Sequence, residues 1–202
     1  MTAVAGSRQD SIAEHLRRSC ETLDRAASDP AMMEAMLRAT EAMAAALRSG
    51  NKILIAGNGG SAADAQHIAG EFLSRLNFDR NPLPAIALTA DTSVLTAIGN
   101  DYGFEEVFAR QVRALGVPGD VAIGLTTSGV SPNVVLGLLA AREAGIATIA
   151  MTGANPGPAG EAADLVVSVP SGQTPRVQEG HMLAAHVICE WVEARLAAES
   201  EA

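Results

Sequence analysis

Two residues near the start of a predicted helix have the types and spacing of a small reactive site. His67 and Glu71 are four positions apart, so on a helix both side chains project from one face, one turn apart. An imidazole and a carboxylate at that spacing can chelate a divalent cation, and zinc accepts nitrogen and oxygen ligands together. An isolated pair of this kind is more often an exposed surface pair, with Glu71 facing Arg75 one turn later. The surroundings must decide between the two interpretations.

A glycine-rich segment, Gly57-Asn58-Gly59-Gly60-Ser61, stands just ahead of this pair and opens its helix. Its glycines permit positive φ and close approach of a ligand, and backbone N–H groups at a helix N-terminus can bind an anion. A tight turn without a ligand is the alternative. A Walker A loop requires a lysine that is missing here. A dinucleotide-binding loop requires an acidic residue about 20 positions on, whereas Asp91 lies farther along.

A second polar segment carries four hydroxyl groups ahead of a helix, those of Thr126, Thr127, Ser128 and Ser131. Ser131 is a natural N-cap with Pro132 at the first helical position, but capping explains only one hydroxyl. Hydroxyls and free N–H groups at a helix N-terminus can bind phosphate without lysine. The chain has a single lysine, Lys52. We therefore expect phosphate binding here, with a Ser/Thr-rich capping turn as the alternative.

A third polar segment, residues 173–186, leads into the last predicted helix. It carries Gln178 and His186, which would lie about 12 Å apart along one regular helix. The two can share an ion only if Gln178 precedes the regular helix or if they come from different subunits. We therefore expect His186 to meet His67 and Glu71 across a chain boundary, at an edge or a subunit interface.

Short apolar runs alternate with helical stretches from residue 51 onwards, and each run is continuously apolar, as in strands buried on both faces. The predicted strands span 52–56, 85–89, 121–126, 147–152 and 165–169, and the predicted helices span 61–76, 92–99, 104–115, 132–144, 158–163 and a last one ending near 196. This order predicts one doubly wound α/β domain over 1–202, with a five-stranded parallel sheet flanked by helices. Ligands in such folds bind beyond the carboxyl ends of the strands, where the three polar segments lie.

Two amphipathic helices are predicted ahead of the first strand, over 10–27 and 30–47, with Asp29 as N-cap. They are more than the sheet of one subunit needs. We interpret residues 1–50 as a helical oligomerisation segment and residues 51–202 as the α/β core.

The overall composition restricts the partners and the compartment. A net charge of −9 and a pI of about 4.8 argue against binding nucleic acid through its phosphates. Cys20 and Cys189 form no C-x-x-C pair and suit a reducing compartment better than a disulfide framework. There is no signal-peptide pattern and no apolar run of membrane-spanning length. We expect a cytoplasmic protein that binds neither nucleic acid nor membrane.

Taken together, the polar segments resemble the sugar isomerase (SIS) domain family over nearly the whole chain. The matching stretches are residues 56–67, 97–103 and 178–181. Within the family they resemble the branch that acts on a seven-carbon sugar phosphate. This resemblance implies an aldose–ketose isomerase that converts sedoheptulose 7-phosphate to D-glycero-D-manno-heptose 7-phosphate through an enediol, the first step towards activated heptose precursors of bacterial glycans. It also implies a homotetramer with active sites between subunits.

The resemblance further implies roles for individual residues. Glu71 is implied as the general base and His186 as the general acid. One Zn²⁺ per subunit is implied, with His67, Glu71, Gln178 and His186 as ligands. Contacts to the sugar phosphate are implied for Asn58, Gly59, Gly60, Ser61, Arg75, Asn100, Asp101, Thr126, Thr127, Ser128, Ser131 and Gln178. Relatives often have serine at position 126, but threonine keeps the hydroxyl group.

Two alternatives stay open. SIS proteins include a non-catalytic relative that binds the bacterial replication initiator and needs no acid–base pair, whereas this chain retains both Glu71 and His186. The other alternative is an SIS isomerase for a different phosphosugar. The motifs define the phosphate and the carbonyl end better than the length of the carbon chain between them.

Overall fold

The computed structural model describes residues 8–200, so residues 1–7 and 201–202, the ends of the predicted domain, lie outside it. The helices are α1 (Arg8–Ala27), α2 (Pro30–Arg48), α3 (Gly60–Leu73), α4 (Thr92–Tyr102), α5 (Val107–Leu115), α6 (Pro132–Glu143), α7 (Gly157–Glu161) and α8 (Thr174–Ser200), with a 3-10 turn η1 (Phe104–Glu106) before α5. The strands are β1 (Ile53–Gly57), β2 (Ala85–Ala87), β3 (Val121–Thr126), β4 (Ala147–Thr152) and β5 (Leu165–Ser168). Among the described helices, none is long and apolar enough to cross a membrane.

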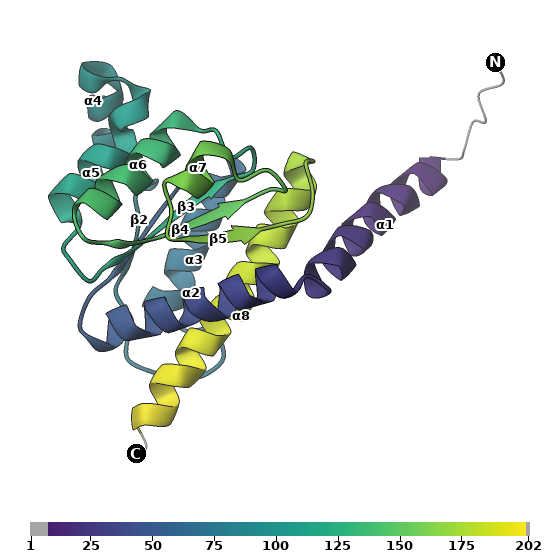
Figure 1. Cartoon of the computed structure of the whole chain (residues 1–202), viewed down its shortest axis with the longest axis horizontal. Coiled ribbons are helices and arrows are strands. Elements are labelled where there is room, and N and C mark those ends of the chain that lie inside the picture. The colour runs from purple at the N-terminus through teal and green to yellow at the C-terminus, as the bar shows by residue number, and fades with distance from the viewer. Residues whose placement is uncertain (1–7, 201–202) are drawn as a thin grey trace.

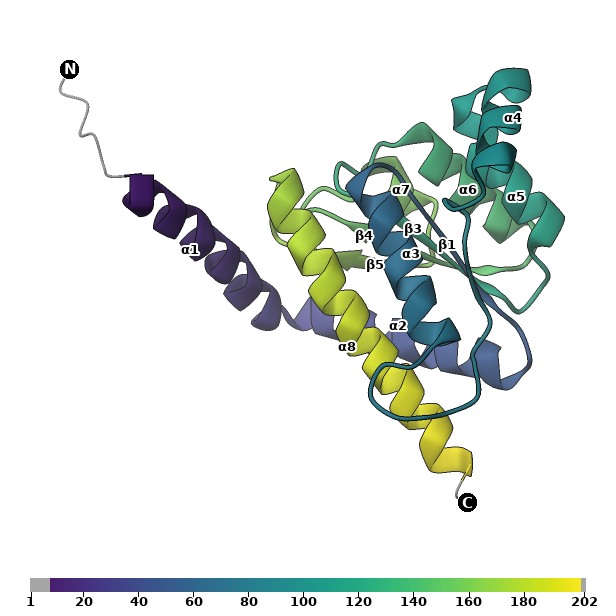
Figure 2. The same cartoon turned by 180° about the vertical axis from the view of Figure 1, so that it is seen from behind.

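The strands form one parallel five-stranded sheet in the order β2-β1-β3-β4-β5, which confirms the predicted fold class. Figures 1 and 2 show α2, α3 and α8 on one face of the sheet and α4 to α7 on the other. The chain leaves β1 for α3 on the first face and leaves the adjacent β3 for α6 on the second face. The carboxyl ends of β1 and β3 therefore flank the point where the connections diverge, which is where such folds bind ligands.

Each face of the sheet has its own apolar core. Neighbouring strand residues point to opposite faces, so Ile55 packs with Met43 and Phe72 in the core under α2, α3 and α8. Leu54 packs with Phe108 in the core under α5, α6 and α7. Burial on both faces explains why the strand segments are continuously apolar.

The two N-terminal helices differ in what they pack against. Figure 1 shows α1 projecting away from the body, and its buried residues are Thr22 and Ala26. In contrast, α2 buries Met43 and other residues against the sheet. The expectation that both helices are surplus to one subunit is therefore corrected for α2, which covers the sheet of its own chain. Asp29 is the N-cap of α2 as predicted, accepting hydrogen bonds from the amides of Ala31 and Met32.

Three boundaries bear on the candidate site. Helix α3 ends at Leu73 and not near 76, so Arg75 lies in the following loop. Strand β2 is shorter than the predicted 85–89, because the chain turns at Leu88, which packs into the second core. Helix α8 begins at Thr174, so Gln178 lies inside the regular helix.

Candidate active site and metal centre

His67, Glu71 and His186 come together at the surface of one chain. His67 Nε2 lies 2.9 Å from Glu71 Oε1, which confirms that both side chains share one face of α3. On α8, His186 brings its Nε2 to 3.1 Å from His67 Nε2 and to 4.0 Å from Glu71 Oε1. One ligand atom from each residue lies within 4.8 Å of the others. The trio is a compact set of two imidazole nitrogens and one carboxylate oxygen.

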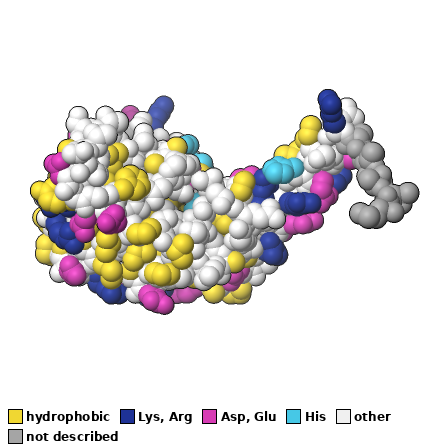
Figure 3. Space-filling model, turned by 90° about the horizontal axis from the view of Figure 1, so that it is seen from above, with side chains coloured by type: hydrophobic (Ala, Val, Ile, Leu, Met, Phe, Trp, Pro, Cys, Tyr) yellow, Lys and Arg dark blue, Asp and Glu magenta, His cyan; other side chains and the backbone are white. Residues whose placement is uncertain are grey.

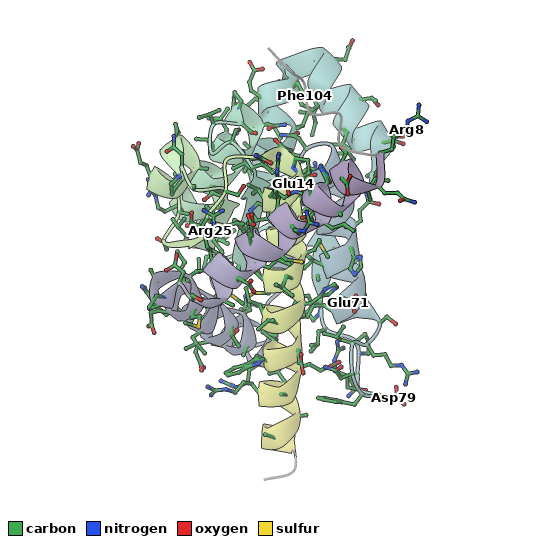
Figure 4. The ribbon with its side chains drawn as sticks, turned by 90° about the vertical axis from the view of Figure 1, so that its right-hand side faces the viewer. Arg8, Glu14, Arg25, Glu71, Asp79 and Phe104 are labelled. Atoms are coloured by element: carbon green, nitrogen blue, oxygen red, sulfur yellow. The ribbon has the colours of Figure 1, made fainter. Side chains whose placement is uncertain are left out.

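The expected chain boundary between His186 and the other two residues is wrong. Helices α3 and α8 lie side by side on the same face of the sheet, and the view in Figure 4 shows Glu71 on α3 beside α8. The site is nevertheless open on one side, because the side chains of His67 and His186 are 50% and 45% exposed. Figure 3 shows histidine side chains on the body next to the hollow that separates it from α1.

Gln178 lies away from the trio within its own chain. It is two turns before His186 on α8, about 12 Å along the axis. Its side chain covers the start of α3, since a Cβ atom added at Gly60 would lie 2.3 Å from Gln178 Nε2. The option that Gln178 precedes the regular helix is therefore excluded. By the same spacing argument, Gln178 can share an ion with a trio only if the trio belongs to another subunit.

The loop after β1 is joined to the first turn of α6 through two side chains. Asn58 and Asn133 each donate an amide hydrogen bond to the other's carbonyl oxygen, at 2.8 Å in both directions. Sequence reasoning missed Asn133. Its only signal was an amide side chain one position after Ser131-Pro132, and it is now the most buried polar residue of that turn, at 2% exposed.

The predicted phosphate-binding hydroxyls converge in the loop after β3. Thr126 Oγ1 lies 3.0 Å from Ser131 Oγ and 3.5 Å from Ser128 Oγ. Ser131 occupies the N-cap position of α6, but its side chain makes no capping bond because its hydroxyl pairs with Thr126. Thr127 is half-buried beside them. On the other side of the point where the connections of β1 and β3 diverge, Gly59 adopts φ +57° and Ser61 is buried at the start of α3.

Three predicted substrate contacts stay apart from these loops. Asn100 and Asp101 lie at the end of α4, in the layer opposite to α3 and α8, where they bond to each other at 2.7 Å. Arg75 is exposed in the loop after α3. Within one chain, the structure therefore assembles two separate clusters, the trio of His67, Glu71 and His186 and the hydroxyl loop, and leaves these three residues outside both.

Two buried polar groups near the site have an atom without a hydrogen-bond partner in the described part of the chain. They are Asp64 Oδ2 on α3 and His181 Nδ1 on α8. Burial raises the pKa of the Asp64 carboxyl, although nearby His67 opposes this. Burial lowers the pKa of His181 to about 4, opposed by the bond between its Nε2 and the Thr152 carbonyl. His181 is therefore neutral and donates through Nε2.

Comparisons with known proteins identify the family of the chain. A family model described as the SIS domain matches residues 15–153. The chain belongs to the SIS domain family, a class defined here by the parallel sheet and the polar loops at its carboxyl edge.

Within that class, several similar proteins are named phosphoheptose isomerase. A phosphoheptose isomerase of a Bradyrhizobium species is 53% identical over 187 residues, covering 93% of this chain and 94% of the relative. One from Aquifex aeolicus is 60% identical over 151 residues, covering 75% and 79%. The solved structure of a phosphoheptose isomerase from Neisseria gonorrhoeae superimposes with a TM-score of 0.87 at 42% identity, covering 93% of this chain and all of the other.

Proposed function

We propose that the protein is a phosphoheptose isomerase that interconverts sedoheptulose 7-phosphate and D-glycero-D-manno-heptose 7-phosphate. The proposal rests on the acid–base pair of Glu71 and His186, which lie close together on α3 and α8, where α3 is the helix that the glycine loop opens. The chain that carries this pair is 53% identical to a phosphoheptose isomerase. The 4.0 Å between Glu71 Oε1 and His186 Nε2 is short enough for both groups to reach adjacent carbons of one substrate.

The reaction needs a proton to move between two neighbouring carbons through an enediol. In our proposal Glu71 takes the proton from C1 of the ketose and returns it to C2, while His186 donates a proton to the C2 carbonyl oxygen and takes up the proton of the C1 hydroxyl as the aldehyde forms. The hydroxyls of Thr126, Ser128 and Ser131 bind the phosphate, with the amides at the starts of α3 and α6 supporting them. In this proposal the reacting end of the sugar lies near the trio, and the phosphate lies at the point where the connections of β1 and β3 diverge.

The trio also fits a metal ion, and we propose zinc. Two imidazoles and a carboxylate are a ligand set that zinc accepts, with a position left for substrate or water. When bound, zinc supplies Lewis-acid polarisation of a carbonyl oxygen. A carboxylate that binds a metal is a weaker base, so either the metal chiefly orders the site or Glu71 leaves it during turnover. A fourth ligand, Gln178, joins only from another subunit.

We also propose a cytoplasmic homotetramer with sites between subunits. Residues 1–50 contribute to assembly chiefly through α1, whose Ile12 and Leu16 are each 62% exposed. Asn100, Asp101 and Arg75 contact substrate across the interface. Assembly of this kind explains why one chain leaves these residues apart from the trio.

An isomerase assay on Glu71→Gln and His186→Ala, with five-, six- and seven-carbon sugar phosphates, tests the function. We expect the wild type to prefer the seven-carbon substrate and each variant to lose at least about 100-fold in kcat. Equal, negligible turnover in wild type and variants would favour the non-catalytic relative. A preference for a shorter sugar would redirect the substrate assignment. Undiminished turnover after complete metal removal would rule out an essential role for zinc.

A further inference from the structure

A buried ion pair lies between the same two helices that carry the trio. Arg80 Nε donates to Glu193 Oε1 at 2.8 Å, and the two side chains are 13% and 1% exposed. Glu193 is seven residues after His186, two turns along one face of α8. Arg80 belongs to the loop that follows α3. The pair therefore joins the helix of His186 to the end of the helix of His67 and Glu71.

The guanidinium of Arg80 also holds the C-terminus of α3. Its Nη2 donates to the backbone carbonyl of Glu71 at 2.8 Å, and its Nη1 donates to the carbonyl of Phe72 at 2.9 Å. These carbonyls belong to the last turn, where a helix has no partners of its own for them. Arg80 thus contacts the main chain of the very residue proposed as base, at the point where α3 ends.

Glu193 completes the junction from the side of α8. Its two oxygens accept hydrogen bonds from the amides of Leu76 and Asn77, at 3.2 and 2.8 Å. Burial disfavours the charge, but the amides of Asn77 and Leu76 and the Arg80 guanidinium outweigh burial and lower the pKa of this carboxyl. A charged carboxylate with all its hydrogen bonds made is thus fixed at the C-terminal end of α3, in the contact between α3 and α8, which we call the seam.

We propose that Arg80 and Glu193 are positioning residues that set the separation between His186 and the pair on α3. The inference rests on the proposed function for the role of the trio. Neither residue touches the reacting atoms. Well-packed apolar side chains could stabilise the fold as much as this buried ion pair does, but they would not align the two helices through directional hydrogen bonds. Removing a group that orients metal ligands without touching the metal typically costs about 10- to 100-fold in metal affinity or activity.

The chain offers a matched control at the other end of the sheet. Lys52 Nζ lies 2.7 Å from Asp120 Oδ2, Asp120 is fully buried, and it also accepts from the amides of Lys52 and Val117. This pair lies at the amino ends of β1 and β3. Lys52→Met therefore breaks a similar ion pair without touching the seam.

The decisive comparison sets Arg80→Met and Glu193→Gln against Lys52→Met. We expect Arg80→Met to lose about tenfold or more in kcat and in affinity for zinc alone, since that is the usual effect of removing a ligand-orienting group. KM should change less, because the phosphate contacts lie on other loops. Glu193→Gln keeps the volume and an acceptor oxygen, so it should lose less than Arg80→Met. Lys52→Met should lower the melting temperature and leave kcat and zinc affinity unchanged.

Cys189 adds a readout that does not depend on turnover. It lies one turn before Glu193 on α8, is 3% exposed, and burial is the main cause that raises its pKa to about 12. In Arg80→Met a thiol reagent should modify Cys189 several-fold faster than in wild type, with exposed Cys20 as internal standard. Lys52→Met should not change this rate.

The outcomes separate the two claims. A wild type that neither isomerises heptose phosphate nor binds zinc defeats the proposed function, and Cys189 labelling then decides alone whether Arg80 holds the seam. A functional wild type and a folded Arg80→Met with unchanged kcat, zinc affinity and Cys189 labelling overturn the positioning role.

Discussion

Asn58 and Asn133 are bonded to each other through both halves of their side-chain amides, each at 2.8 Å. The bond joins the loop after β1 to the first turn of α6, on either side of the point where the sheet's connections diverge. It therefore fixes the position of the glycine loop relative to the start of α6, which follows the hydroxyl loop.

Asn133→Ala should loosen the glycine loop relative to the hydroxyl loop. Asn133 is 2% exposed, so the loss leaves the amide of Asn58 without its partner and costs about 1–2 kcal/mol of folding free energy. We expect KM for the sugar phosphate to rise at least several-fold with a smaller change in kcat, because the trio is untouched. Urea unfolding and steady-state kinetics measure the two effects. An unchanged KM would show that the bond does not shape the phosphate site.

Gly57 and Gly60 should respond differently to alanine. A Cβ at Gly57 would lie 2.6 Å from the Ser61 backbone oxygen, which cannot move without distorting α3, so Gly57→Ala should destabilise the fold. A Cβ at Gly60 would meet the flexible end of Gln178 at 2.3 Å. Gly60→Ala should therefore stay within about 1 kcal/mol of wild type and instead change KM by displacing Gln178. Thermal unfolding and steady-state kinetics distinguish the two variants. Equal losses of stability in Gly57→Ala and Gly60→Ala would contradict this prediction.

Metal removal should lower the stability of the wild type. A ligand that binds only the folded state at 100 times its Kd adds about 2.7 kcal/mol, so metal-depleted protein should gain several degrees in Tm when zinc is returned. His186→Ala removes one of the three donors and should abolish most of that gain. Asp79→Asn, an exposed carboxylate in the loop after α3 (Figure 4), is the control and should keep it. A gain that persists in His186→Ala would place the ion elsewhere.

His181 should make stability depend on pH. Its folded pKa of about 4 lies below the ordinary value of 6.5, so the unfolded chain takes up the proton first as the pH falls. The contribution is complete above about pH 6.5 and is lost towards pH 4, up to about 3 kcal/mol. His181→Gln can still donate to the Thr152 carbonyl but does not titrate. Urea unfolding between pH 4 and 7 should show a flatter profile for this variant, and parallel profiles would contradict the assignment.

The apolar face shared by α2 and α8 should be covered in the assembled protein. Met33, Leu37, Val187 and Trp191 line one groove there, and Trp191 is 47% exposed. Trp191→Glu places a charge in that groove and should shift the sedimentation profile towards smaller species. Val117→Glu, which alters an equally exposed apolar residue in the loop before β3, should not. A tetramer that survives Trp191→Glu would move the interface to another surface.

The sequence predicted those features that follow from local chemistry. Continuous apolar runs identified the buried parallel strands, and the four-residue spacing placed His67 and Glu71 on one face of α3. Contacts between segments distant in the chain could not be found in this way. The crossing of α8 over α3 brings His186 to His67 across 119 positions, and Arg80 meets Glu193 across 113. Helix spacing alone therefore suggested a chain boundary that tertiary packing makes unnecessary.

The position of Trp191 has an optical consequence. It is the only tryptophan in the chain, and it stands at the rim of the groove between α2 and α8. Fluorescence excited at the red edge of protein absorption therefore comes from one known place, without any label. The colour of that emission follows the polarity around a single indole ring, so a dilution series reads directly whether water or another protein surface covers this face.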